Sequence, residues 1–422
     1  MSRRPPTPRG RSSTVAHRRI ILSLATAAVL VLGAAPAAVA GPTSTDREAA
    51  GILATATPGE PLTVVTTTET ASGPQFTTEV AGSHAEAKAL ISDALADPGT
   101  AAVDLAHQVS IATDTAVTKK RKSSKTRRSN DSQRKRQWAL DRLAAEKVWR
   151  KSSGKGVVVA VVDTGVQANH PDLKGQVLKG WDFVESDSKA NDRNGHGTHV
   201  AGIIAAKANN KRGIAGLAPS SRILPVRVLN SAGTGSTVAV ARGIVYAARK
   251  GADVINLSLA GNSPDAQVQA AVRYAVRRGV VVVAAAGNSG CNAPTTYPAA
   301  FPGVIGVGAS DRSDGVAPFS NCGTYVDVVA PGTGITSTMI KRPSLSLPCA
   351  YGKSYCVLDG TSMASPHVAA AAAILISRTK HRLTLSKVAY LLTARADDIV
   401  TPGYDTTSGR GVLNIRRALV GR

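Results

Sequence analysis

A continuous run of small and β-branched residues at 157–162 is the feature that most restricts how this chain can fold. A strand with no polar alternation has to be buried on both faces, as in a parallel sheet covered by helices. Four further runs share this character, at residues 223–228, 254–257, 280–284 and 304–307. The segments between them carry one apolar face at helical spacing and stop at Gly251 and Gly279, residues typical of helix ends. The sequence therefore predicts an α/β fold with a mainly parallel sheet between two helical layers.

Three polar motifs lie beside these apolar segments. Asp163 ends the first strand, His196 opens an apolar helix in Asn-Gly-His-Gly-Thr-His, and Ser362 precedes a long apolar run in Gly-Thr-Ser-Met-Ala-Ser-Pro. At a helix start the Ser362 N–H is unpaired and faces the positive end of the helix dipole. Each residue alone is compatible with a structural role. Together they predict a nucleophile, a base and an orienting carboxylate.

The order Asp, His, Ser and the three motifs resemble those of the subtilisin-like serine proteases, or subtilase family, in its thermitase-like and proteinase K-like branches. The resemblance runs from about Asp131 to the C-terminus. It implies a three-layer α/β/α fold and hydrolysis of peptide bonds through an acyl-enzyme. It also makes Asn288, which follows the apolar run at 280–284, the side-chain donor of an oxyanion hole beside the Ser362 N–H. The alternative for Asn288 is an ordinary turn.

The resemblance also implies the substrate site, in which a peptide pairs as an additional strand with a sheet edge. The residues expected to bind substrate are Ser258, Leu259 and Ala260 at the edge and Ala285, Ala286 and Gly287 in the pocket wall. The family usually has Gly where this chain has Ala260. None of these residues is a carboxylate, which favours a secreted endopeptidase of broad, apolar-preferring specificity over a processing protease that cuts after basic residues.

Alternatives of another class are a catalytically silent binding module on the same scaffold and a basic protein that binds anionic polymers. The intact set of Asp163, His196, Ser362 and Asn288 favours an enzyme.

Two calcium sites follow from the same resemblance, because carboxylate and amide oxygens suit a hard cation. The first has Asp182, Glu185 and Asp187; the second has Asp131, Asp172 and Asn210. Lys211 and Arg212 lie beside the second set and would repel the ion unless they point outward. A solvated acidic loop is the alternative in both places. Calcium is the only cofactor expected, and its role would be structural.

Four cysteines in an exported chain predict two disulfides, with three pairings open. Cys349 and Cys356 bracket a short loop, which leaves Cys291 to pair with Cys322. Metal ligation is the alternative, but no Cys-x-x-Cys spacing supports it.

Residues 1–40 have the pattern of a secretory signal peptide: an Arg-rich start, an apolar run at 20–32 and Ala-Val-Ala at 38–40. The apolar run is too short for a membrane span, which needs roughly 18 residues. The sequence thus predicts an extracellular protein without a membrane anchor after signal removal. A Sec signal is expected, and Arg18-Arg19 leaves twin-arginine export open.

Residues 41–118 are expected to form a small α+β propeptide, with a strand near 61–66, a helix at 83–96 capped by Ser83, and an extended piece at 102–105. Subtilisin relatives carry an inhibitory, chaperone-like propeptide at this place; a spacer used only in secretion is the alternative. Residues 119–130 are expected to be a basic linker, with maturation between Val117 and Asn130, and residues 131–422 the peptidase domain.

The formal charge of +23 is unevenly distributed along the chain. Residues 41–117 carry 2 basic and 10 acidic residues, a net of −8, whereas residues 137–422 carry 33 basic and 17 acidic, a net of +16. Opposite charges suggest that the first segment docks on the second; a basic enzyme whose charge has no docking role is the alternative. Protein substrates and the propeptide are the expected partners of a monomer, with no nucleic acid.

Overall fold

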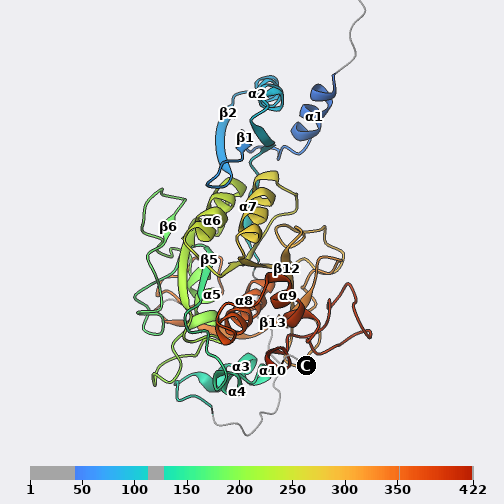
Figure 1. The fold of residues 1–422 in the computed structure, drawn as a ribbon. Coiled ribbons are helices and arrows are strands. Elements are labelled where there is room, and N and C mark those ends of the chain that lie inside the picture. Colours follow the sequence, from blue (N-terminus) through green and yellow to red (C-terminus); the bar gives the residue numbers. More distant parts are fainter. Residues whose placement is uncertain (1–42, 113–127, 351, 421–422) are drawn as a thin grey trace, which may run out of the picture. The chain divides into compact units, whose positions relative to one another are not determined.

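The predicted parallel sheet has seven strands in the computed structural model, which describes residues 43–112, 128–350 and 352–420 (Figure 1). The strand order is β13-β12-β11-β9-β5-β7-β6, and every neighbouring pair is parallel. The predicted signal peptide and most of the basic linker lie outside the described residues. The strands are β5 (Val158–Asp163), β6 (Trp181–Asp182), β7 (Arg222–Arg227), β9 (Val254–Leu257), β11 (Val281–Ala285), β12 (Val304–Ser310) and β13 (Val328–Pro331).

Helices cover both faces of this sheet, which confirms the three-layer α/β/α prediction. Along β5, Val159 and Val161 belong to one buried apolar cluster and Ala160 and Val162 to another, because successive side chains point to opposite faces. Among the described residues, no helix is long and apolar enough to cross a bilayer. The first cluster includes α3 (Trp138–Arg142), α4 (Ala145–Trp149), α5 (His196–Ala205), α8 (Thr361–Arg378), α9 (Leu385–Thr393) and α10 (Ile415–Val420); the second includes α6 (Thr237–Arg249) and α7 (Ala266–Arg277).

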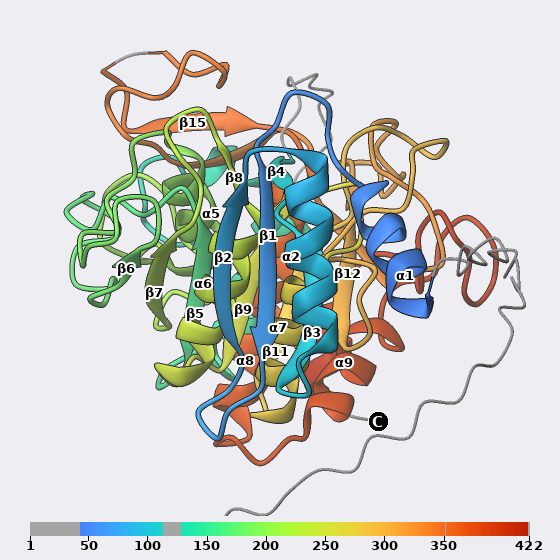
Figure 2. The ribbon, with the colours of Figure 1, turned by 90° about the horizontal axis from the view of Figure 1, so that it is seen from above.

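The N-terminal segment (residues 43–112) forms a second, smaller sheet with its own apolar core (Figure 2). Its strand order is β2-β1-β3, with antiparallel pairs. The predicted helix is present, and Ser83 caps it by accepting a hydrogen bond from the Glu86 N–H at 3.1 Å. The elements are α1 (Ser44–Leu53), β1 (Leu62–Thr68), β2 (Gln75–Ala81), α2 (His84–Ala96), β3 (Thr100–Leu105) and β4 (Gln108–Ile111).

The N-terminal segment contacts α6 and α7 through hydrogen bonds from Arg and Tyr side chains to its backbone carbonyls. The Ser72 carbonyl accepts from Arg249 Nε at 2.8 Å and from the Tyr274 hydroxyl at 3.0 Å. Among the described residues, the Lys/Arg–carboxylate pair across this contact joins Arg277 to Glu69 at 3.7 Å, and both side chains are exposed. Exposed pairs contribute at most about 1 kcal/mol. In the described part of the chain, the opposite net charges therefore give one exposed Arg–Glu pair at this contact.

The last strand of the N-terminal segment, β4, leaves the small sheet. It pairs antiparallel with β10 (Leu259–Ala260) on one side and β8 (Thr234–Ser236) on the other. A segment from the start of the chain thereby becomes the central strand of a three-stranded sheet.

Candidate active site

Asp163 and His196 are in direct contact at the carboxyl end of β5. His196 Nδ1 lies 2.8 Å from Asp163 Oδ1 and 3.0 Å from Oδ2, and both side chains are fully buried. The Thr164 N–H also donates to Asp163 Oδ1, at 2.7 Å. A carboxylate at Nδ1 holds the proton there and leaves Nε2 as the basic nitrogen. Among the described residues, Nε2 is buried without a hydrogen-bond partner.

Two glycines let α5 approach β5 this closely. A Cβ on Gly197 would lie 3.1 Å from Asp163 Oδ1 and would overlap the Gly165 carbonyl oxygen. Gly195 has φ of 114°, and a Cβ there would meet Met339 Sδ at 2.5 Å. Both glycines therefore make room for neighbouring protein atoms.

Ser362 is the second residue of α8, after Gly360, whose φ of 143° excludes most other residues. Pro366 has no N–H, so the Ser362 carbonyl has no donor four residues on in the helix. Ser258 Oγ fills that place by donating to the Ser362 carbonyl at 2.9 Å, and Asn256 Nδ2 in turn donates to Ser258 Oγ. Side chains from β9 and the residue after it thus fix the start of α8.

The Ser362 hydroxyl is not hydrogen-bonded to His196 in this structure. It donates to the Ser258 carbonyl at 2.9 Å and accepts from the Ala112 N–H at 3.0 Å. The structure therefore brings Asp163 to His196, but proton transfer to His196 Nε2 requires the hydroxyl to turn. Hydrogen bonds of this kind often form only when the reacting complex forms.

The two predicted donors of the oxyanion hole, the Ser362 N–H and Asn288 Nδ2, do not donate to carbonyls of α8. The Ser362 N–H donates to the Ala112 carbonyl at 3.2 Å. Asn288 Oδ1 accepts from the Thr361 N–H at 2.9 Å and from Thr361 Oγ1 at 2.8 Å, which fixes the side-chain amide. Among the described residues, Asn288 Nδ2 is buried without an acceptor. An unpaired buried donor is unfavourable unless it serves a ligand or a transition state.

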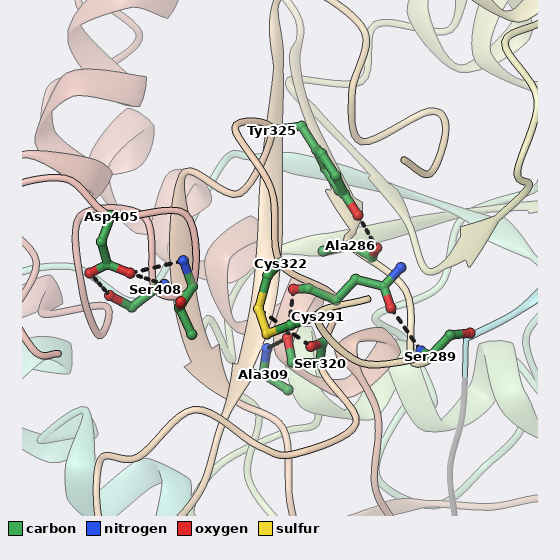
Figure 3. The surroundings of a disulfide bond; sticks show 11 residues. Ala286, Ser289, Cys291, Ala309, Ser320, Cys322, Tyr325, Asp405 and Ser408 are labelled. Carbon is green, nitrogen blue, oxygen red and sulfur yellow. Dashed lines mark hydrogen bonds between the residues drawn. A yellow bond between two sulfur atoms is a disulfide. The ribbon is translucent and has the colours of Figure 1, made fainter. Parts of the chain in front are cut away.

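A disulfide and hydrogen bonds from neighbouring residues hold the loop that carries Asn288 (Figure 3). Its predicted disulfide joins Cys291 to Cys322, with Cα atoms 4.5 Å apart. Asn321 Oδ1 accepts from the Ser289 N–H at 2.7 Å, and the Tyr325 hydroxyl donates to the Ala286 carbonyl at 3.2 Å. The other predicted pair, Cys349–Cys356, is also present. Cys356 lies in β15 (Tyr355–Leu358), which pairs with β14 (Ile335–Thr338).

Two of the three residues predicted at the substrate-binding edge pair with an extended segment. Leu259 pairs with Ile111 and Ala260 with Ser110. The pairing of β4 with a second strand, β8, was not predicted. The sequence feature that could have indicated it is the Gly-rich segment around Gly235, where a Cβ would overlap the Val228 carbonyl. Ala285, Ala286 and Gly287 are buried and lead directly into Asn288, and Gly287 N–H donates to Thr361 Oγ1 at 3.1 Å.

Side chains of the bound segment fill apolar space. Ala112 and Val109 are buried, with 7% and 6% of their surfaces exposed. Val109 belongs to the apolar cluster that contains Leu259 and Val240. A cavity of about 210 Å³ lies beside it, between the N-terminal segment and α6 and α7. The space around the segment therefore accepts small and branched apolar side chains.

The residues of the first predicted calcium site already enclose a cation. Buried Arg227 donates through Nη1 to Asp182 Oδ2 at 2.6 Å and to Glu185 Oε1 at 3.0 Å. Asp182 Oδ1 accepts two backbone N–H groups, and Asp187 Oδ1 accepts the Lys189 N–H at 2.7 Å. A calcium ion would have to displace the guanidinium, so this arrangement does not fit the ion.

The second predicted calcium set fits a cation better. Asp131 accepts the N–H groups of Asn210 at 2.9 Å and Asn209 at 3.0 Å, and Asp172 Oδ1 accepts Asn210 Nδ2 at 2.8 Å. Both carboxylates are buried, and Asp172 Oδ2 also accepts the Ile214 N–H at 2.9 Å. The salt bridges found among the described residues do not include either carboxylate. Burial and the neighbouring Asp172 carboxylate raise the pKa of Tyr355, whose hydroxyl donates to Asp172 at 3.0 Å. Two buried anions without a counter-charge are the usual setting for a bound cation.

Three further histidines near these motifs are buried. His199 is fully buried, and burial lowers its pKa to about 3. Burial also lowers the pKa of His367 to about 4, and its Nδ1 lies 2.8 Å from the Met363 carbonyl. His170 Nε2 lies 2.9 Å from the Ser354 carbonyl. None of the three contacts Ser362.

Comparison with known proteins shows which family this chain is similar to. Residues 154–411 match the family model described as the subtilase family, which is more than half of the chain. The chain is 46% identical over 284 residues to thermitase from Thermoactinomyces vulgaris, covering 67% of this chain and 96% of thermitase. It is 50% identical over 238 residues to a thermophilic serine proteinase from Bacillus sp. strain AK1, covering 56% of each.

A solved structure extends the similarity to the N-terminal segment. Fervidolysin from Fervidobacterium pennivorans, described as a keratinolytic enzyme related to subtilisin, matches with a TM-score of 0.75 and 30% identity. The match covers 87% of this chain and 62% of fervidolysin.

Proposed function

The chain belongs to the subtilase family of serine endopeptidases, and from that premise we propose that Asp163, His196, Ser362 and Asn288 are its catalytic residues. The observation that supports the proposal most directly is the backbone of Ala112. Its carbonyl oxygen accepts from the Ser362 N–H while its N–H donates to Ser362 Oγ. A peptide carbonyl thus lies where an acyl-transfer site would bind one.

The proposed reaction has two halves. Ser362 Oγ attacks the peptide carbonyl carbon and gives its proton to His196 Nε2, while Asp163 stabilises the imidazolium through Nδ1. The oxyanion accepts from the Ser362 N–H and Asn288 Nδ2. His196 then protonates the leaving amine as the C–N bond breaks, and the acyl-enzyme remains. Water loses a proton to His196, attacks the ester, and frees the carboxylate and Ser362.

Subtilases act on protein substrates with broad specificity, and we infer an apolar preference within that range. Val109 lies in the apolar cluster that contains Leu259, and the Ala112 side chain is apolar and buried. A preference for basic residues would need carboxylates in the pocket, and residues 258–260 and 285–287 carry none.

We further propose that the N-terminal segment is an inhibitory prosegment and the first substrate of its own chain. Its strand β4 occupies the peptide-binding edge and ends in the contacts of Ala112 with Ser362. These contacts favour cleavage of the bond between Ala112 and Thr113. That bond lies five residues before the start of the 117–130 interval expected from the basic linker. Cleavage within the linker would then be a later trimming step.

We expect the chain starting at Gly41 to be cut after Ala112 in the wild type and to stay intact as Ser362→Ala. Amino-terminal sequencing of the purified products would show this, and a peptidyl phosphonate should label Ser362 in the processed protein only. A folded wild-type chain that is neither cut nor labelled would support the catalytically silent module. A first cut within residues 117–130 would still support peptidase activity but would contradict cleavage between Ala112 and Thr113.

Calcium is proposed only for the site of Asp131, Asp172 and Asn210. Lys211 and Arg212, which could repel the ion, have exposed side chains. The ion would contribute two positive charges opposite two buried carboxylates and would stabilise the fold without taking part in the reaction.

In metal-free Ser362→Ala protein loaded with calcium alone, EDTA is expected to lower the melting temperature by roughly 5–10 °C. A ligand at 100 times its Kd contributes about 2.7 kcal/mol, and each kcal/mol shifts Tm by about 2–4 °C in domains of comparable size. Asp172→Asn should remove the response, whereas Asp187→Asn, in the set occupied by Arg227, should keep it. An equal EDTA response in both variants would contradict this assignment.

We also propose secretion as a monomer. The signal-like residues 1–40 and two disulfides support export, because disulfides persist in oxidising compartments.

A further inference from the structure

Three ionisable side chains meet where the N-terminal segment crosses the start of α7. Asp104 is in β3, His107 lies between β3 and β4, and Asp265 is the residue that caps α7. One ligand atom from each lies within 4.8 Å of the other two. His107 Nε2 lies 3.8 Å from Asp104 Oδ1, too far for a hydrogen bond. The cluster is separate from the catalytic residues and from both predicted calcium sets.

Two atoms of this cluster are buried without partners among the described residues: His107 Nε2 and Asp265 Oδ2. Asp265 is 2% exposed, and the side chains of His107 and Asp104 are 9% and 14% exposed. The two carboxylates also accept backbone hydrogen bonds. Asp265 Oδ1 accepts the Val268 N–H at 2.9 Å, and Asp104 Oδ2 accepts the Ala266 N–H at 3.0 Å. The free atoms are therefore not needed to hold the backbone.

The charges of the cluster favour a divalent cation. With a neutral His107 imidazole, the two carboxylates give the cluster a net charge of −2. A proton on His107 would change the net charge to −1, and a divalent ion would bring it to zero. Burying net charge is costly. One nitrogen and two carboxylate oxygens suit zinc and similar transition ions, whereas calcium prefers six to eight oxygen ligands.

We propose that Asp104, His107 and Asp265 bind a divalent transition-metal ion, with zinc as the probe, and that this ion links the N-terminal segment to the peptidase domain. Two ligands come from the segment and one from the domain, so the ion is bound fully only while the segment is docked. His107 is five residues before Ala112. The ion would thus slow release of the segment after cleavage, a role that rests on the prosegment function proposed above.

The surroundings leave room for the rest of the coordination shell. The cavity of about 210 Å³ is lined by His107 and Asp265, together with Thr57 and Thr237. Thr237 Oγ1 accepts the His107 N–H at 3.1 Å, which fixes the backbone that carries the imidazole. A fourth position could be filled by water from this cavity, as in zinc sites with three protein ligands.

Metal binding is tested in the chain from Gly41 carrying Ser362→Ala, in which the segment stays attached whether or not the peptidase proposal holds. The metal-free protein is dialysed against zinc chloride at pH 7 and its zinc content measured. His107→Gln and Asp265→Asn should each weaken one zinc site by about 10- to 100-fold or more, a loss typical even of outer-shell changes. Asn is as good a helix cap as Asp, so Asp265→Asn should preserve α7.

His84→Gln is the matched control, because His84 is an exposed histidine of the same segment. It should retain the site. Cobalt(II) should give a visible ligand-field absorption in the parent and the His84 variant that is missing from the His107 variant. Equal zinc affinity in all four proteins would overturn the proposal. The proposal would also be overturned if release of the segment depended on pH but not on zinc, because the cluster would then bind protons only.

In the active chain, zinc should slow and EDTA should speed the loss of the N-terminal fragment after cleavage, followed by gel filtration. Asp265→Asn should lose this response while cleaving itself normally. A response that persists in Asp265→Asn would show that zinc acts elsewhere.

Discussion

Asp163→Asn is expected to lower kcat by about 10⁴-fold while leaving the fold intact, the scale typical of losing the carboxylate of such a triad. Both Asp163 oxygens lie within 3.0 Å of His196 Nδ1, so the wild-type carboxylate keeps the proton on that nitrogen. An asparagine amide can donate to Nδ1, which moves the proton to Nε2. His196 then cannot accept the Ser362 proton. Hydrolysis of a chromogenic peptide measures kcat.

Asp187→Asn is the matched control, since its carboxylate accepts a local backbone N–H and does not touch His196. Its kcat should equal that of the wild type. Circular dichroism and Tm should be unchanged in Asp163→Asn. A folded Asp163→Asn enzyme with wild-type kcat would show that His196 is not the base.

Much of the fold could be predicted from residue patterns because burial dictates them. A strand such as β5, whose side chains alternate between two apolar clusters, cannot be polar on either face. The helix after Ser83 was predictable from its cap, which acts locally. Strand β8 was less predictable. It is short and derives its hydrogen bonds from β4, a segment more than 100 residues away in sequence.

The candidate site was predictable as a set of residues but not as a set of contacts. Motif spacing indicates that Ser362 and His196 serve one site. It does not indicate that the hydroxyl bonds to the Ser258 carbonyl while Ala112 is present. Arg227 occupies the first predicted calcium set, although it lies 42 residues from Glu185 in sequence. Long-range side-chain contacts of this kind follow from the packed fold and leave no local pattern.

Asn288→Ala is expected to lower kcat by about 100- to 1000-fold, or roughly 3–4 kcal/mol, with a smaller change in KM. The buried Nδ2 has no acceptor among the described residues, so its hydrogen bond should form mainly to the charge that develops in the transition state. Steady-state hydrolysis of a peptide anilide separates kcat from KM.

Asn288 has a second contact that could account for a loss of activity, because its Oδ1 accepts two hydrogen bonds from Thr361, next to Ser362. Asn288→Asp keeps an oxygen for Thr361 but replaces the Nδ2 donor with an acceptor. If Nδ2 stabilises the oxyanion, Asn288→Asp should be at least as slow as Asn288→Ala, since a carboxylate would repel the developing charge. If Asn288→Asp retained wild-type kcat while Asn288→Ala lost it, the residue would be a support for the start of α8. The second donor of the oxyanion hole would then have to be another group.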